Sequence, residues 1–248
     1  ARLRRPGPPV GALLVPCSDA RAARVYSLVS PWRKNRTGAF DSYFNELAWC
    51  HRPVVPRPGE QDPRSERENR MRIGVVLGSV REGRAGEPVA NWVLEGARAH
   101  GGADVELIDV KSFGLPVFDG AYLPAMADKK YDDPAVQAWS DAVDACDAFV
   151  VVTPEYNHSV PGGLKNAVDH LGGEWLGKPV AFVGYGADGA VRAVEHWRQI
   201  FGNFDAKAIR AQLSINIFAE MTENGFVPNE RRAGELDALL DSLIAAVG

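Results

Sequence analysis

The sequence predicts a doubly wound α/β fold, in which five parallel strands form an open sheet with helices on both faces. Three observations predict it. Between residues 71 and 248, five short apolar segments alternate with five segments of helical periodicity. The strand segments are apolar at consecutive positions, which indicates burial on both faces. Strands joined by helices favour right-handed crossovers and therefore a parallel sheet.

The first predicted elements surround a glycine-rich turn. The β-branched apolar run over 72–77 predicts a strand. Apolar residues at every third or fourth position over 87–100 predict a helix, and the segment 105–110 predicts a short second strand. A proline begins the next segment of helical spacing, over 134–146, and prolines suit a first helical turn. A continuous apolar run over 148–153 predicts the third strand.

The remaining elements repeat this alternation. A helix over 161–171 leads to a strand over 179–185, and a helix over 191–201 leads to a last strand within 208–218. The last predicted helix spans 229–247. Its apolar stripe consists of Leu236, Leu239, Leu240, Leu243 and Ile244.

Residues 1–70 differ from the rest of the chain in composition. They hold 9 of the 17 prolines and carry 13 Lys and Arg against 7 Asp and Glu. Frequent prolines remove backbone hydrogen bonds, and no apolar periodicity lasts beyond 40–49. We therefore predict a disordered or weakly ordered basic extension over 1–70 and one domain over 71–248.

Composition also excludes several classes of function. No apolar stretch approaches the ~20 residues that span a bilayer, so we expect no membrane protein. Residues 71–248 carry 15 Lys and Arg against 25 Asp and Glu, which argues against nucleic acid as the partner of this domain. The three scattered cysteines form neither a disulfide framework nor a zinc site, and they suit a cytoplasmic location.

In a doubly wound sheet the ligand lies at the carboxyl ends of the strands, so the loops there are candidates for the site. The first loop (78–86) contains Ser79, Arg81, Arg84 and Gly86 and leads into a helix. Its glycines allow close backbone approach, the helix N-terminus favours an anion, and arginines bind phosphate. We predict a phosphomonoester site, with a solvated glycine-rich turn as the alternative. The loop lacks the Lys-[Ser/Thr] ending of a P-loop, which disfavours an ATPase.

The third loop (153–161) combines backbone donors, an amide, an aromatic ring and an imidazole between a strand and a helix. A flat heteroaromatic ring with carbonyls and ring nitrogens needs such a set of groups. Glu155, His158 and Ser159 could suggest a hydrolase triad. The absence of a G-x-S-x-G elbow disfavours that interpretation.

The fourth loop (184–189) matches G-x-G-x-x-G at Gly184, Gly186 and Gly189. A dinucleotide site is therefore an open alternative, but that fingerprint normally occupies the first strand–helix turn. We favour a glycine-rich wall of the pocket formed by the first and third loops.

Together the three loops resemble the NAD(P)H-dependent FMN reductase family, over about residues 71–220. The matching segments are Gly78-Ser79-Val80-Arg81, Thr153-Pro154-Glu155-Tyr156-Asn157, Pro161-Gly162-Gly163-Leu164-Lys165-Asn166-Ala167-Val168-Asp169 and the fourth-loop glycines. The resemblance implies a flavodoxin-like fold with bound FMN, and NADPH or NADH as co-substrate. It implies homodimers or homotetramers.

The resemblance also assigns residues to parts of the cofactor. It implies that the FMN phosphate is held by Ser79, Arg81, Arg84 and Gly86. It implies that the isoalloxazine ring is held, largely through backbone groups, by Pro154, Glu155, Tyr156 and Asn157. Tyr185 and Gly186 would line the other edge of the ring. No catalytic side chain is expected, because the flavin carries the chemistry.

The function expected on this basis is hydride transfer from NAD(P)H through FMN to a quinone, azo, flavin or similar small acceptor. One alternative is a non-enzymatic flavoprotein that acts as a redox sensor or as an electron shuttle for a protein partner. A second is an NAD(P)-binding protein that uses the Gly184 loop. A third is an interaction protein in which the basic extension dominates.

Overall fold

The computed structural model describes residues 70–223 and 225–247. Five strands in this part of the chain form one parallel sheet in the order β2-β1-β3-β4-β5, which confirms the predicted doubly wound fold. The strands are β1 (Arg72–Leu77), β2 (Asp104–Asp109), β3 (Ala148–Pro154), β4 (Pro179–Gly186) and β5 (Lys207–Asn216). Apart from Arg70, the extension predicted for 1–70 lies outside the described residues.

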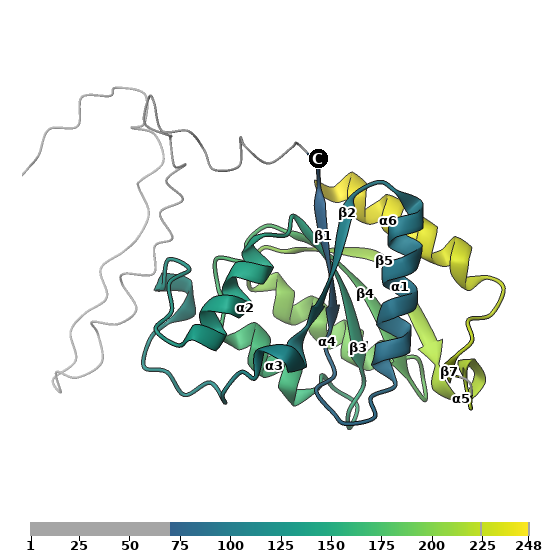
Figure 1. Cartoon of the computed structure of the whole chain (residues 1–248), viewed down its shortest axis with the longest axis horizontal. Coiled ribbons are helices and arrows are strands. Elements are labelled where there is room, and N and C mark those ends of the chain that lie inside the picture. The colour runs from purple at the N-terminus through teal and green to yellow at the C-terminus, as the bar shows by residue number, and fades with distance from the viewer. Residues whose placement is uncertain (1–69, 224, 248) are drawn as a thin grey trace, which may run out of the picture. The chain divides into compact units, whose positions relative to one another are not determined.

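Helices cover both faces of this sheet (Figure 1). Two of them, α1 and α6, pack on one face, and α2, α3 and α4 pack on the other. Each predicted helix is present, with bounds that differ from the prediction by at most a few residues. The helices are α1 (Gly86–His100), α2 (Pro134–Asp144), α3 (Gly162–Asp169), α4 (Val191–Gly202) and α6 (Arg232–Val247).

The central strands are buried on both faces, as their continuous apolar runs predict. Every residue of β3 is buried, and so are all residues of β4 except Gly186. The side chains of Trp139, Trp175 and Trp197 fill the layer between the sheet and helices α2 to α4. Fully burying a large apolar side chain stabilises a fold by about 1.5–3 kcal/mol, so these two layers supply most of the driving force for folding.

Several short elements interrupt the simple alternation, and the sequence patterns did not predict them. Two are single 3-10 turns between β2 and α2, and the others follow β5. They are η1 (Val110–Phe113), η2 (Pro124–Met126), α5 (Ile217–Glu220), β6 (Met221–Thr222) and β7 (Gly225–Phe226). The ring of Phe226 lies edge-on against Trp92 of α1, with 5.4 Å between ring centroids, and this contact fixes the segment to the α1 side of the sheet.

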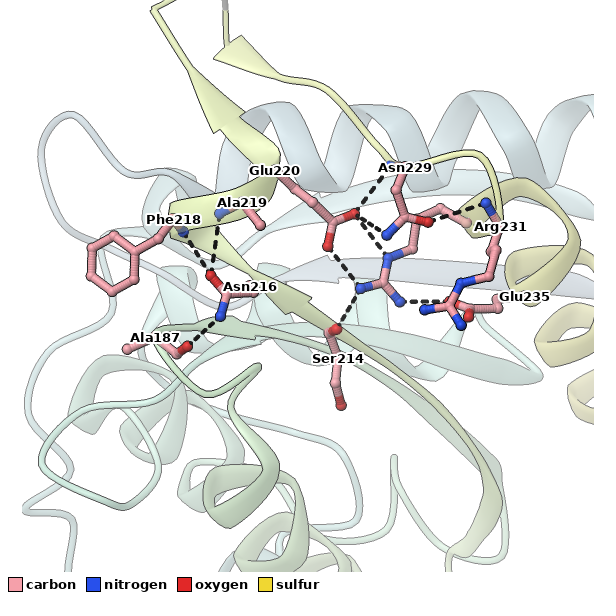
Figure 2. A network of polar contacts seen from close by, with 10 residues as sticks. Ala187, Ser214, Asn216, Phe218, Ala219, Glu220, Asn229, Arg231 and Glu235 are labelled. Atoms are coloured by element: carbon pink, nitrogen blue, oxygen red, sulfur yellow. Dashed lines mark hydrogen bonds and ion pairs between the residues drawn. The ribbon is translucent and has the colours of Figure 1, made fainter.

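A buried ion pair holds this segment after β5 in place (Figure 2). The carboxylate of Glu220 accepts hydrogen bonds from Nε and Nη2 of Arg232 at 2.9 and 2.7 Å. It also accepts from the backbone and side-chain nitrogens of Asn229, both at 3.2 Å. Arg232 in turn donates to the carbonyl of Ser214 in β5, at 2.7 Å. Because both charges are buried and well bonded, the pair ties α5 and the start of α6 to the sheet edge.

None of the helices in the described part of the chain has both the length and the apolar content needed to cross a bilayer.

Candidate functional site

The first, third and fourth loops lie side by side, because the strands that precede them are neighbours in the sheet. The parallel register pairs Leu77 with Val152 and Pro154 with Tyr185, so the carboxyl ends of β1, β3 and β4 lie at one edge. The strand order reverses between β1 and β3, and doubly wound proteins bind their ligands outside such a switch point. The loops at the bottom of Figure 1 form this edge.

The two arginines of the first loop are in different environments. The guanidinium of Arg84 is mostly buried and forms two bonds with the carboxylate of Asp109, one of them 2.7 Å long. It also donates to the carbonyl of Ser79 at 2.9 Å. Arg81 is exposed, and within the described residues its recorded contact is with the ring of Tyr156, 5.7 Å from the ring centroid. Arg84 therefore holds the loop, whereas the charge of Arg81 is free to meet an anion.

Ser79 links the first loop to the third. Its hydroxyl is buried and lies 3.2 Å from the hydroxyl of Tyr156. Helix α1 begins beside it after Ala85, which provides no side-chain cap for the first N–H groups. Uncapped N–H groups at a helix start attract an anion. The edge therefore presents a hydroxyl, a free guanidinium and an uncapped helix N-terminus within one loop.

Gly86 and Tyr185 meet beneath the first loop. A Cβ atom at Gly86 would lie 2.3 Å from the hydroxyl of Tyr185, so this close approach requires glycine. Tyr185 is buried in the core on the α1 side, and burial raises the pKa of its hydroxyl. Its side chain therefore supports the first loop from below, and Gly186 is the part of β4 that reaches the site edge.

The third loop forms a tight two-residue turn. Tyr156 and Ser159 exchange two backbone hydrogen bonds, each 3.0 Å long. The two residues between them, Asn157 and His158, have φ angles of 49° and 64°. Side-chain-bearing residues adopt this left-handed region infrequently, and such positions cluster at functional sites. The exposed amide of Asn157 stands at the tip of the turn.

Glu155 points toward α4. Its carboxylate accepts from the backbone nitrogens of Arg192 and Ala193 at 3.0 and 3.3 Å, and from Nε of Arg192. Burial alone would raise the pKa of Glu155, but these hydrogen bonds outweigh burial and lower it below its ordinary value. The backbone of Glu155, rather than its side chain, is left to face the site.

Two of the three glycines in the fourth-loop motif, Gly184 and Gly189, have packing roles. A Cβ atom at Gly184 would lie 2.7 Å from the carbonyl oxygen of Gly189, and one at Gly189 would lie 2.7 Å from Cβ of Ser214 in β5. Gly189 also has a φ of 67°, which favours glycine. The close approach of loop and strand thus accounts for Gly184 and Gly189, whereas a Cβ atom at Gly186 would make only ordinary contacts, 3.6 and 3.8 Å from its nearest neighbours.

Three residues that shape the site were not identified from the sequence. Asp109 holds Arg84, and Arg192 holds Glu155. Nδ1 of His196 lies 2.9 Å from the hydroxyl of Ser159. Asp109 is the last residue of β2 and lies at the same edge of the sheet. A carboxylate at the end of a predicted strand is the sequence feature that could have identified it. The partners on α4 depend on how that helix packs, which no local pattern specifies.

A parallel five-stranded sheet in this order, with a glycine-rich loop at the reversal of strand order, defines an α/β protein of the flavodoxin-like class. The sequence model of the NADPH-dependent FMN reductase family matches residues 71–220, and the chain belongs to this family. The resemblance seen in the loop motifs is thereby confirmed.

Individual relatives agree with this assignment. NAD(P)H-dependent FMN reductase ntnL of Nectria sp is 40% identical over 126 residues, which are 49% of this chain and 63% of that protein. Quinone reductase of Escherichia coli (strain K12) is 35% identical over 147 residues, which are 55% of this chain and 72% of that protein. The match therefore spans less than two thirds of the length of the Nectria protein.

A solved structure shares the fold. The flavoenzyme NAD(P)H:(acceptor) oxidoreductase FerB from Paracoccus denitrificans has a TM-score of 0.57 and 24% sequence identity. The superposition covers 71% of this chain and 97% of that chain.

Proposed function

We propose that the three loops hold FMN and that the protein transfers hydride from NADPH or NADH, through bound FMN, to a quinone or similar small acceptor. The observation that carries the proposal is the free charge of Arg81 at the switch point. Arg84 is already paired with Asp109, so Arg81 is the first-loop cation that a phosphate can engage. The relatives in Nectria and Escherichia coli, an NAD(P)H-dependent FMN reductase and a quinone reductase, support the cofactor and the acceptor class.

The donor set fits a phosphomonoester at one end of the site and a flat ring at the other. Arg81, Ser79 and the uncapped start of α1 would hold the phosphate. Arg84 and Gly86 would support that loop from below. The ring would lie against the backbone of Pro154, Glu155 and Tyr156, the amide of Asn157 and the edge formed by Gly186, with Tyr185 packed beneath.

The chain contributes binding and orientation. When bound, FMN supplies hydride and electron transfer, so no side chain is assigned as an acid or a base. Asn157, exposed at the tip of the turn and without a recorded hydrogen bond in the described residues, is the polar side chain that can meet a ring carbonyl. The site would lie against the ends of β3 and β4, whose residues are buried almost throughout. The low dielectric of this buried region would strengthen polar contacts made next to it.

Steady-state oxidation of NADPH and of NADH with a benzoquinone acceptor tests the activity. We expect turnover with parallel lines in double-reciprocal plots, because donor and acceptor would use one stacking position in succession. Intersecting lines would contradict the shared position. Negligible turnover in FMN-loaded protein would instead support the non-enzymatic sensor or shuttle.

We further propose a cytoplasmic homodimer or homotetramer. The scarcity of cysteine supports the location. Exposed apolar side chains between η1 and α2, at Val117, Leu123 and Met126, support self-association because such side chains gain from being covered. Light scattering coupled to gel filtration should give a mass of two or four chains, and substitution of all three by Ser should shift it toward one. A monomeric parent protein would refute this part of the proposal.

A further inference from the structure

The segment that carries the two-residue turn is bonded to α4 at three places along its length. In each place a side chain of residues 153–159 meets a group on α4. The three pairs are Thr153 with Trp197, at 3.0 Å, Glu155 with Arg192 and Ala193, at 3.0 and 3.3 Å, and Ser159 with His196, at 2.9 Å. The strand end, the loop and the turn therefore share one support.

Glu155 is the charged member of this set, and it completes the N-terminus of α4. The helix begins after Ala190, which is left-handed at a φ of 57° and supplies no side-chain cap. The first N–H groups of a helix need acceptors, and the positive end of the helix dipole favours a carboxylate. The side chain of Glu155, 8% exposed, supplies this carboxylate from outside the helix.

Helix α4 is itself firmly held. Its side chains Trp197 and Phe201 are fully buried against the sheet. Arg198 donates to the carbonyls of Ile209 and Arg210 in β5, at 2.6 and 3.2 Å. A loop that is bonded to this helix is therefore bonded to the rigid part of the fold.

The turn needs such support, because Asn157 and His158 both occupy the left-handed region. An unusual backbone conformation persists when the surrounding structure fixes it. We propose that Glu155 is a positioning residue, which holds the turn at 156–159 in its binding conformation through α4 before any cofactor arrives. Its carboxylate, bonded to α4, would make no contact with the ring. That the fixed turn is the FMN-binding conformation rests on the proposed function. The support of the turn by Glu155 is a property of the FMN-free protein.

The chain offers a matched control for this role. Asp133, the exposed residue directly before α2, also caps a helix with its carboxylate, which accepts from the backbone nitrogens of Ala135 and Val136 at 2.8 and 3.3 Å. Helix α2 makes no recorded hydrogen bond with residues 153–159 among the described residues. Asp133→Ala therefore removes a carboxylate helix cap without removing a hydrogen bond of the third loop.

The test measures FMN affinity by quenching of flavin fluorescence, and hydrogen exchange of the Tyr156 and Ser159 amides in FMN-free protein. Glu155→Ala should weaken FMN binding roughly tenfold or more, because without the charge-assisted hydrogen bonds to α4 the turn no longer stays in its binding conformation, and should speed exchange of both amides. Glu155→Gln keeps one acceptor oxygen and should recover part of both effects. Asp133→Ala should lower the melting temperature and leave both readouts at parent values.

Two results would overturn the inference, and a third concerns the proposed function alone. If Glu155→Ala and Asp133→Ala change FMN affinity and amide exchange equally, Glu155 stabilises the fold and nothing more. If Glu155→Ala does not fold, Glu155→Gln replaces it in the test. Hydrogen exchange of the Tyr156 and Ser159 amides at the parent rate in Glu155→Gln would then refute the positioning role. If the parent itself binds no FMN, the proposed function fails, while the exchange measurement still decides the role of Glu155.

Discussion

Arg232→Met should lower the free energy of unfolding by about 3–5 kcal/mol, the usual cost of removing one partner of a buried ion pair. The substitution would leave the carboxylate of Glu220, 3% exposed, without its cation. Asn229 would remain as a partner, but two neutral N–H groups do not replace a guanidinium bound through Nε and Nη2. Urea unfolding followed by circular dichroism measures the loss.

The neighbouring Arg231 supplies the control. It is exposed, and in the described residues its hydrogen bonds run through the backbone: its nitrogen donates to Asn229 and its carbonyl accepts from the nitrogen of Glu235, so a side-chain substitution keeps both. Arg231→Met should change stability by no more than about 0.5 kcal/mol, as is usual for surface substitutions. Equal losses in the two variants would show that the ion pair is not a major contribution to stability.

The stability that Arg232→Met loses should also depend on pH. The hydrogen bond from Arg232 lowers the pKa of Glu220 below its ordinary value of 4.5. A lowered pKa in the folded state contributes stability that is complete above the unfolded value and is lost as the pH falls through the folded value. The difference in unfolding free energy between parent and Arg232→Met should therefore shrink as the pH falls below 4.5. A difference that stays constant into this range would contradict the assigned ionisation of Glu220.

Arg81→Ala should weaken FMN binding by roughly 1.5–3 kcal/mol, which is about 10- to 150-fold in the dissociation constant. Because Arg81 is exposed and has no ion pair in the described part of the chain, its removal should leave the unfolding free energy almost unchanged. Arg98→Ala is the matched control, since Arg98 is an exposed arginine near the other end of α1. Equal affinities in these two variants would remove the phosphate role from Arg81.

Arg84→Ala separates support from binding within the same loop. Its guanidinium holds Asp109 and the carbonyl of Ser79, so its loss should appear mainly as lower stability. A variant that loses FMN affinity at full stability would instead return Arg84 to the phosphate contacts that the resemblance implies.

Much of the fold could be predicted because its signals are local. The apolar run over 148–153 indicates a strand buried on both faces, and every residue of β3 is buried. The stripe beginning at Leu236 correctly indicates a helix, although α6 begins at Arg232 rather than at 229. The segment after β5 could not be predicted, because β6 and β7 are two residues long and their position depends on a contact between Glu220 and Arg232.

The site shows the same division between local and long-range information. The three loops could be located because each follows a predicted strand. The direction in which each side chain points could not be predicted, because it depends on contacts with residues distant in the sequence. Arg84 meets Asp109 through the pairing of β1 with β2, and Glu155 meets Arg192 through the packing of α4. Sequence reasoning therefore placed the named residues in the loops at this edge and assigned all of them to the cofactor, without separating residues that bind it from residues that hold the loops.

The most direct test is reconstitution of the parent protein with FMN, followed by desalting and a visible absorption spectrum. If the switch-point loops form a mononucleotide site, the protein should keep one FMN per chain, and inorganic phosphate should weaken the binding by competing for Arg81. Folded protein that emerges colourless after incubation with excess FMN would contradict the account.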